Sequence, residues 1–144
     1  MTSEDSTDAL LDALVRYTFK VTGVLTRIGA ENDLSLTQLR VFGILRDRRP
    51  RVTELAAYLG LDKSTMSGLI DRAERRGLLA REKNPNDGRV VDVFLTPAGH
   101  ELTRRLYGEA RAILAPELDR LRPDQREQLL ALLNPILEPD DGAR

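Results

Sequence analysis

Cysteine is absent from this 144-residue chain, and histidine occurs once, as His100. Without cysteine the chain can form no disulfide framework, no thiolate metal site and no cysteine redox switch. A single imidazole also argues against a histidine-based metal centre. We therefore predict a protein without a bound metal ion and without a cofactor.

Long apolar runs are also missing. No stretch approaches the roughly 20 apolar residues that a membrane-spanning helix requires. Residues 1–8 are polar and acidic, and no apolar segment follows that would make them a secretory signal. We expect a cytoplasmic protein with no membrane partner, and the length suggests a single domain, residues 1–144.

The recurring sequence signatures of enzymes are not found either. The chain contains no Gly-rich phosphate loop, no nucleophile elbow and no cluster of metal-ligating residues at a suitable spacing. Its carboxylates are plentiful, but they fall on the exterior of predicted helices, where they are usually solvated. We predict that the protein is not an enzyme.

Charge is distributed unevenly along the chain. The net charge is −1, although nucleic-acid-binding proteins are often basic overall. The basic residues concentrate in the middle, as Arg46, Arg48, Arg49, Arg51, Lys63, Arg72, Arg75, Arg76, Arg81, Lys83 and Arg89. Acidic residues gather near the ends, as Glu4, Asp5, Asp8, Glu138, Asp140 and Asp141. This pattern is expected if the middle of the chain faces phosphate.

The N-terminal region has the apolar periodicity of a long helix. Residues 8–30 carry apolar side chains at three- and four-residue spacing, and we expect the polar residues 1–7 before them to be frayed. Apolar residues occur on more than one side of this helix. A long helix of that kind often packs against another chain as well as against its own core.

Residues 97–138 form a second helical region at the other end. Thr96 can cap its start, and Pro97 suits the first helical position. Pro123 opens a last helix, and Pro139 ends it and leaves a short tail.

Three short helices are predicted between these regions. Ser35 and Gln38 have the spacing of a capping box at the start of the first, which ends near Arg46. Thr53 can cap the second, residues 54–59.

The third short helix, residues 63–76, follows almost at once. Gly60 can end the preceding helix, Asp62 can cap the new one, and Gly77 ends it. Its inward stripe consists of Met66, Leu69, Ile70 and Ala73. Two short helices joined by a tight turn make a helix-turn-helix, whose second helix is the recognition helix that enters the DNA major groove.

A two-stranded hairpin follows the recognition helix. Residues 78–83 and 90–95 have strand alternation, with Asp92 on the face opposite its apolar neighbours, and residues 84–88 are dense in turn formers. We interpret this hairpin as a wing. The predicted fold is therefore mainly α with a small β-hairpin: a winged helix-turn-helix DNA-binding lobe over residues 35–95, flanked by long helices.

Candidate DNA-binding residues lie on the outer face of the recognition helix and on the wing. On the helix they are Lys63, Ser64, Thr65, Ser67, Gly68, Arg72 and Arg75. On the wing they are Arg81, Lys83, Asp87 and Arg89. Hydroxyls can reach base edges or phosphates, glycine allows close backbone approach, and an arginine at a wing tip suits the narrow minor groove. The alternative is that serine and threonine simply favour helix starts and that the arginines are solvated.

The sequence resembles the multiple antibiotic resistance regulator (MarR) family of bacterial transcription factors over nearly its whole length. The most specific part is residues 71–81 (DRAERRGLLAR), followed by residues 84–89 (NPNDGR) and 95–99 (LTPAG). Residues 36–39 (LTQL) and 53–56 (TELA) add weaker matches.

This resemblance implies a homodimer held by helices 8–30 and 97–138 that binds double-stranded DNA at a pseudo-palindromic promoter site. It also implies repression that is relieved by a small, often aromatic, effector. In the family an acidic residue at the start of the recognition helix can pair with the wing arginine, which gives Asp62 a wing-orienting role toward Arg89. The family's middle wing base is replaced here by Gly88, which removes one phosphate contact.

Two questions stay open at the level of the sequence. A winged helix can also bind protein rather than DNA, but such a module would need an apolar outer face on the recognition helix. The effector-binding residues are not identified, although some of the scattered aromatic residues could line a pocket. These are Tyr17, Phe19, Phe42, Tyr58, Phe94 and Tyr107. Most aromatic residues at helical spacing belong to the core.

Overall fold

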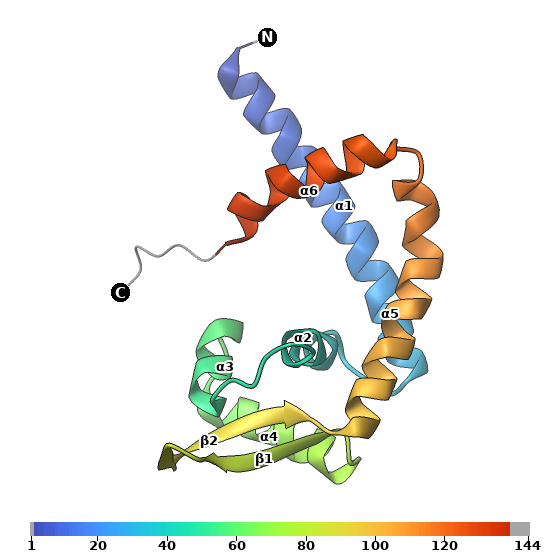
Figure 1. Ribbon diagram of the computed structural model, residues 1–144. Coiled ribbons are helices and arrows are strands. Elements are labelled where there is room, and N and C mark those ends of the chain that lie inside the picture. Colours follow the sequence, from blue (N-terminus) through green and yellow to red (C-terminus); the bar gives the residue numbers. More distant parts are fainter. Residues whose placement is uncertain (1, 139–144) are drawn as a thin grey trace. The chain divides into compact units, whose positions relative to one another are not determined.

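The computed structural model describes residues 2–138 of the chain. In order, its elements are α1 (Ser3–Glu31), α2 (Leu36–Leu45), α3 (Val52–Leu59), α4 (Lys63–Arg75), β1 (Leu79–Asn84), β2 (Asp87–Leu95), α5 (Pro97–Leu118) and α6 (Pro123–Leu137) (Figure 1). The fold is mainly α with one antiparallel hairpin, as predicted. The chain divides within α5 into two compact units, one reaching to Ala110 and the other beginning at Arg111. The prediction of one domain over residues 1–144 stays a prediction.

α1 begins earlier than predicted. The Thr2 hydroxyl accepts the Asp5 N–H at 3.1 Å, and the Asp5 carboxylate accepts the Thr2 N–H at 3.0 Å. This reciprocal capping box satisfies amides that would otherwise lack partners at the helix start. The expectation of a frayed start is therefore wrong for residues 3–7, which are helical.

α2 begins where it was predicted to begin. The Ser35 hydroxyl accepts the Gln38 N–H at 3.1 Å, and the Gln38 side chain accepts the Ser35 N–H at 2.8 Å. The predicted capping box is therefore confirmed.

One hydrophobic core joins the elements of the first unit. Ile28 of α1, Phe42 of α2, Leu55 of α3, Ile70 of α4 and Leu106 of α5 are all buried in it. The hairpin contributes its buried side chains to the same core. The short helices of the lobe are thus held by shared burial, because helices of 8 to 13 residues are marginal on their own.

α3 starts before its predicted cap. Arg51 is the N-cap and makes no side-chain capping bond, so Thr53 lies inside the helix and its predicted capping role is wrong. The reason is tertiary: the Pro50 carbonyl accepts the Val93 N–H at 3.0 Å, and Arg51 forms a bridge with Asp92. Pairing with β2 fixes the extended backbone before the helix, which a sequence pattern does not reveal.

The turn between α3 and α4 is tight. Gly60 adopts a φ of 66°, a left-handed conformation that glycine reaches without a Cβ clash. The Leu61 N–H donates to the Ala56 carbonyl at 3.0 Å and closes the end of α3. The predicted glycine C-cap is confirmed, and the turn sets the recognition helix directly after α3.

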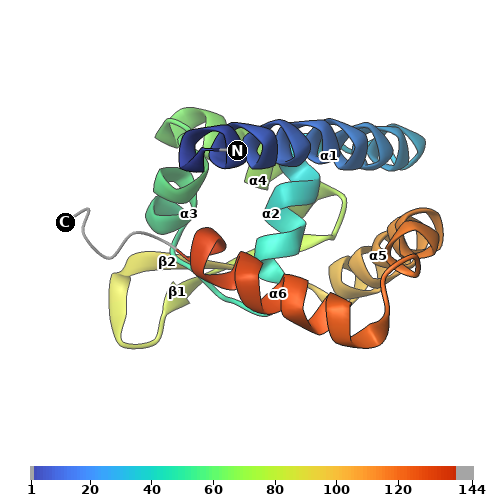
Figure 2. The same ribbon diagram turned by 90° about the horizontal axis from the view of Figure 1, so that it is seen from above.

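β1 and β2 are antiparallel and keep one register from the Leu79–Leu95 pair to the Lys83–Val91 pair. The register then shifts between Lys83 and Asn84, and Asn84 pairs with Asp87. The strands therefore reach further into the predicted turn than residues 83 and 90. The hairpin tip projects away from the helices of the lobe (Figure 2).

α5 begins as predicted after Thr96, whose hydroxyl accepts the Gly99 N–H at 3.1 Å and donates to the Gly77 carbonyl. In the second unit, Arg126 donates to the Leu121 carbonyl at 2.8 Å and closes the turn before α6. The predicted stop at Pro139 and the tail after it lie outside the described residues. Over residues 2–138, no helix is long and apolar enough to cross a membrane.

Candidate nucleic-acid interface

Asp62 organises the start of the recognition helix. Its carboxylate accepts the Thr65 N–H at 2.7 Å and the Ser64 hydroxyl at 2.8 Å, which confirms the predicted cap. These hydrogen bonds, led by the one from the Thr65 backbone, lower the pKa of Asp62 below its ordinary value. The charged carboxylate also complements the positive end of the helix dipole. The predicted wing-orienting contact between Asp62 and Arg89 is not made in this structure, where the Arg89 guanidinium pairs with Asp87.

The recognition helix has a buried side and an exposed side. Met66, Leu69, Ile70 and Ala73 are buried, as predicted. The other side presents Lys63, Ser64, Thr65, Arg72 and Arg75 as exposed residues, and Ser67 and Gly68 as half-buried ones. A Cβ added at Gly68 would lie 3.4 Å from Arg72 Nη1, so the arginine lies over this glycine. The exposed side is polar and cationic, unlike a surface built to bind an apolar partner.

Four cations on the recognition helix and the wing have no partner within the described chain. Over residues 2–138, the side chains of Lys63, Arg72, Arg75 and Lys83 make no hydrogen bond, ion pair or ring contact. Charged groups of this kind are available to neutralise phosphates, because no intramolecular bond has to break first. The first three lie on α4 and the fourth on β1, so they belong to the two elements predicted to contact DNA.

Arg81 has a different environment from these four. Its guanidinium donates to the Asp71 carboxylate at 2.5 Å and to the Glu74 carboxylate at 3.2 Å. The hydrogen bond with Glu74 and the charges of both carboxylates raise the pKa of Arg81 above its ordinary value. Arg81 therefore joins β1 to α4, and the predicted role as a wing contact with DNA is not supported by its partners.

The opposite face of the wing is held by an arginine that the sequence did not single out. Arg49, in the segment between α2 and α3, donates to the Glu82 carboxylate at 2.6 Å, and its guanidinium carbon lies 3.9 Å from the centre of the Phe94 ring. Successive strand residues point to opposite faces, so Arg81 and Glu82 engage different neighbours. The sequence places Arg49 in a basic cluster but does not reveal its partner, which lies 33 residues away.

A small network of hydrogen bonds between polar side chains lies near the tip of the wing. Both carboxylate oxygens of Asp92 accept from the Asn84 amide, at 3.1 and 3.2 Å, and the Asn84 side-chain oxygen accepts the Asn86 N–H at 2.8 Å. Asp92 is only 6 % exposed. Asp92 is therefore buried although it alternates with apolar residues along β2, and its carboxylate is satisfied by the Asn84 amide.

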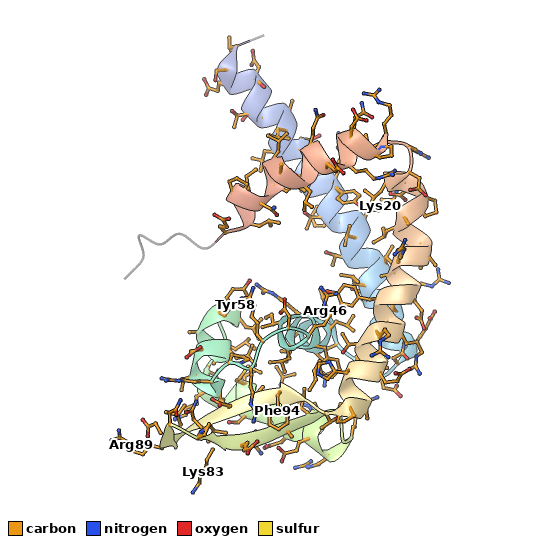
Figure 3. All side chains as sticks on the ribbon, viewed as in Figure 1. Lys20, Arg46, Tyr58, Lys83, Arg89 and Phe94 are labelled. Atoms are coloured by element: carbon orange, nitrogen blue, oxygen red, sulfur yellow. The ribbon has the colours of Figure 1, made fainter. Side chains whose placement is uncertain are left out.

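Arg89 lies at the wing tip, and Figure 3 shows it with Lys83 at the end of the hairpin, away from the body of the lobe. Its side chain is 91 % exposed and is paired with Asp87 at 3.1 Å. The hydrogen bonds from the Arg89 side chain and backbone lower the pKa of Asp87 below its ordinary value. The pair is local and exposed, so it orients the arginine without burying it.

The aromatic residues do not gather into one site. Phe42 is in the core, with 1 % exposure, whereas Tyr58 and Tyr107 each hold an arginine against the ring. The guanidinium of Arg46 lies 4.2 Å from the centre of the Tyr107 ring, and that of Arg40 lies 5.5 Å from Tyr58. Tyr58, Arg46 and Phe94 are labelled in Figure 3. Over residues 2–138, no group of three acidic or histidine side chains could hold a metal ion.

These elements define a class of protein. A short capped helix with a cationic outer face follows a tight turn, and a braced basic hairpin follows the helix. This is the arrangement of a winged helix-turn-helix, in which the recognition helix enters the major groove and the neighbouring elements contact the backbone.

Comparison with known proteins gives the family. The model of the MarR family matches residues 32–90. The chain is 32 % identical over 108 residues to the uncharacterized HTH-type transcriptional regulator YkoM of Bacillus subtilis, covering 74 % of this chain and 70 % of that protein. It is 28 % identical over 123 residues to the HTH-type transcriptional repressor NicR of Pseudomonas putida, covering 85 % and 78 %. The fold matches BpsR of Bordetella bronchiseptica with a TM-score of 0.67 at 27 % identity, covering 90 % and 93 %.

The chain belongs to the MarR family of transcriptional regulators and is a DNA-binding regulator, not an enzyme. The resemblance inferred from the sequence motifs is thereby confirmed.

Proposed function

We propose that this regulator is a homodimeric repressor that binds a pseudo-palindromic promoter site in double-stranded DNA and is released by a small-molecule effector. The observation that carries the proposal is the set of cations without an intramolecular partner on α4 and β1: Lys63, Arg72, Arg75 and Lys83. We expect the protein to act in the cytoplasm.

Each predicted residue has a role in this proposal. Ser64, Thr65, Ser67 and Gly68 approach the base edges and nearby phosphates from the first turns of α4, while Lys63, Arg72 and Arg75 neutralise phosphates. At the wing, Arg89 enters the minor groove, Lys83 contacts the backbone and Asp87 orients Arg89. Arg81 holds the wing on α4, and Asp62 caps the helix.

Exposed apolar residues on the terminal helices support the homodimer. On α1, Leu10, Leu11 and Phe19 are 56 %, 58 % and 71 % exposed. On α6, Leu132 and Leu137 are 69 % and 73 % exposed, and α6 buries none of its residues. Large apolar side chains left exposed on a helix, considered for each helix by itself, are a mark of an interaction site. A second copy of the chain is the occupant that we propose, since two recognition helices match a site of two half-sites.

Repression and effector release rest on the relatives. NicR is named a transcriptional repressor, and the BpsR structure concerns regulation of DNA binding by 6-hydroxynicotinic acid. We propose a small aromatic acid as the chemical class of effector for this chain. The pocket residues are left unassigned.

The test begins with selection of a binding site from a pool of random 30-bp duplexes by the full chain. Affinity for the selected duplex is then measured against salt concentration, and the mass of the free protein is measured by light scattering. We expect a dimer, a site with two half-sites about 34–36 Å apart, and a steep linear loss of affinity in a log–log salt plot. A stable monomer, or binding that salt does not weaken, would contradict the proposal and favour a protein-binding module.

A further inference from the structure

The C-terminal end of α1 has a fixed and unusually tight shape. The Leu34 N–H donates to the Gly29 carbonyl at 2.8 Å, and the Asp33 N–H donates to the Ala30 carbonyl at 3.4 Å. Asp33 accordingly adopts a φ of 55°, a left-handed conformation that is uncommon outside glycine but that aspartate and asparagine adopt more readily than other residues. A Cβ on Gly29 would lie 2.5 Å from the Leu34 carbonyl oxygen, so the fold-back requires glycine there.

The end of the recognition helix is bonded to this turn. Arg76, the C-cap of α4, donates through Nη1 to the Asp33 carbonyl and through Nη2 to the Asn32 carbonyl, both at 3.1 Å. Two parallel bonds from one planar guanidinium fix orientation as well as distance. The positive charge also offsets the partial negative charge at the end of α1.

α5 reaches the same turn from another direction. Arg105 donates to the Asn32 side-chain oxygen at 3.0 Å, and the Asn32 amide donates to the Ile28 carbonyl at 2.8 Å. Three elements far apart in the sequence therefore meet at Asn32. We call Asn32, Asp33, Arg76 and Arg105 the Asn32 joint.

Arg76 differs from its neighbour Arg75 in its hydrogen-bond partners. Arg75 has no side-chain partner over residues 2–138, whereas both terminal nitrogens of Arg76 donate to backbone carbonyls of the turn after α1. A guanidinium engaged in this way is poorly placed to neutralise a phosphate as well. Its geometry fits a group that holds the recognition helix in place.

We propose that Arg76 is a positioning residue: through the Asn32 joint it sets the angle of the recognition helix relative to α1, and it does not contact DNA. The proposal rests on the proposed homodimer in one respect. If α1 helps to form the dimer, the Asn32 joint also determines which half-site spacing the two recognition helices fit.

The test compares Arg76→Ala with Arg75→Ala on the duplex selected by the wild-type protein, and on versions with one or two base pairs added or removed between the half-sites. For Arg75→Ala we expect the salt slope to fall by about 1 with the spacing preference unchanged. For Arg76→Ala we expect an unchanged salt slope, roughly tenfold weaker binding to the best spacing and a flatter spacing preference. A slope reduced by about 1 with an unchanged spacing preference, or wild-type binding, would overturn the proposal.

A measurement without DNA tests the Asn32 joint independently of the proposed dimer. Hydrogen exchange of the Asp33 and Leu34 amides should be faster in Arg76→Ala than in wild type, because the turn loses its two side-chain donors. Unchanged exchange refutes the joint. If wild type selects no paired half-sites but this exchange is faster, the joint stands and the dimeric function fails.

Asn32→Ala provides a second variant in case Arg76→Ala does not fold. It removes the acceptor for Arg105 but keeps both carbonyls that Arg76 holds. We expect a flatter spacing preference than that of the wild-type protein and, again, no change in salt slope; a wild-type spacing preference would count against the joint. A reduced salt slope here would contradict the proposal, since Asn32 carries no charge.

Discussion

The Arg81 guanidinium donates to the Asp71 carboxylate at 2.5 Å and so joins the first strand of the wing to the recognition helix. Glu74, one turn further along α4, accepts from the same guanidinium at 3.2 Å. On the other face of the hairpin, Arg49 holds Glu82. The wing and the recognition helix are therefore bonded to each other, and the cations that we propose contact DNA extend from this pair of elements.

Arg81→Ala should weaken binding to the selected duplex without lowering the salt slope. The substitution frees the wing from α4 but removes no phosphate contact, and because the ion pairs are about one-third exposed we expect a loss of roughly tenfold at most. Salt-titrated binding of Arg81→Ala and of Asp71→Asn measures this. Asp71→Asn should weaken binding less than Arg81→Ala, because Glu74 still accepts from Arg81. A drop of about one in the slope for Arg81→Ala alone would show that Arg81 contacts DNA directly.

Arg72→Ala should behave in the opposite way. Arg72 lies on the exposed side of α4 without an intramolecular partner over residues 2–138, so its removal leaves the fold unchanged and removes one neutralised phosphate. We expect the salt slope to fall by about 1 and the binding to random-sequence DNA to weaken along with specific binding. Arg104→Ala, which removes an exposed arginine paired with Glu101 on α5, is the control. An unchanged slope for Arg72→Ala would remove this residue from the interface.

Local features of the fold were predictable because their causes lie within a few residues. The capping box at Ser35, the cap at Asp62 and the helix start at Thr96 each depend on a side chain bonding an amide three residues away. The buried stripe of α4 follows from the spacing of its apolar residues in the same way. The motif after Asp71 then identified the family.

Long-range partners were not predictable from the same patterns. Arg49, Arg76 and Arg81 look alike in the sequence as members of a central basic region. In the structure each of the three has a bonding partner, which lies 33, 43 and 10 residues away in the sequence, respectively. These three arginines therefore differ from the cations that have no intramolecular partner and remain available to DNA. Thr53 failed as a cap for a related reason, since pairing with β2 fixes the start of α3. The sequence pattern could identify the basic surface but not which of its charges are already used.

Asp62 should make the stability of the lobe depend on pH in the acid range. Its pKa is lowered in the folded chain, so the charged carboxylate adds stability above its unfolded pKa, and this is lost as pH falls through the folded pKa. We expect Asp62→Ala to lower the melting temperature at pH 7 and Asp62→Asn, which can still cap, to lower it less. The advantage of wild type over Asp62→Asn should shrink as the pH is lowered below about 4. A difference that stays constant down to pH 2 would show that the charge plays no part.

Two glycines of α1 should respond to alanine in opposite ways. A Cβ at Gly23 meets nothing within 4 Å, so Gly23→Ala should stabilise the protein by up to about 1 kcal/mol through helix propensity. A Cβ at Gly29 would lie 2.5 Å from a backbone oxygen and 3.1 Å from a Leu39 methyl, so Gly29→Ala should destabilise it by roughly 1–3 kcal/mol. Denaturant unfolding at one protein concentration measures both. If Gly29→Ala is as stable as wild type, the end of α1 can relax, and the turn is not fixed by this glycine.

Arg89→Ala should abolish tight binding to the selected duplex while leaving the fold intact. The side chain is 91 % exposed and forms an exposed ion pair with Asp87, so the folded chain loses little when it is removed. The DNA complex, in contrast, loses the group that we propose enters the minor groove, where the potential favours arginine. Circular dichroism and thermal unfolding establish the fold, and binding is measured at physiological salt. Asp87→Asn is the matched control: it keeps Arg89 but removes the carboxylate that holds it, so we expect binding to weaken much less. Unchanged affinity for Arg89→Ala would mean that the arginine at the wing tip does not take part in recognition.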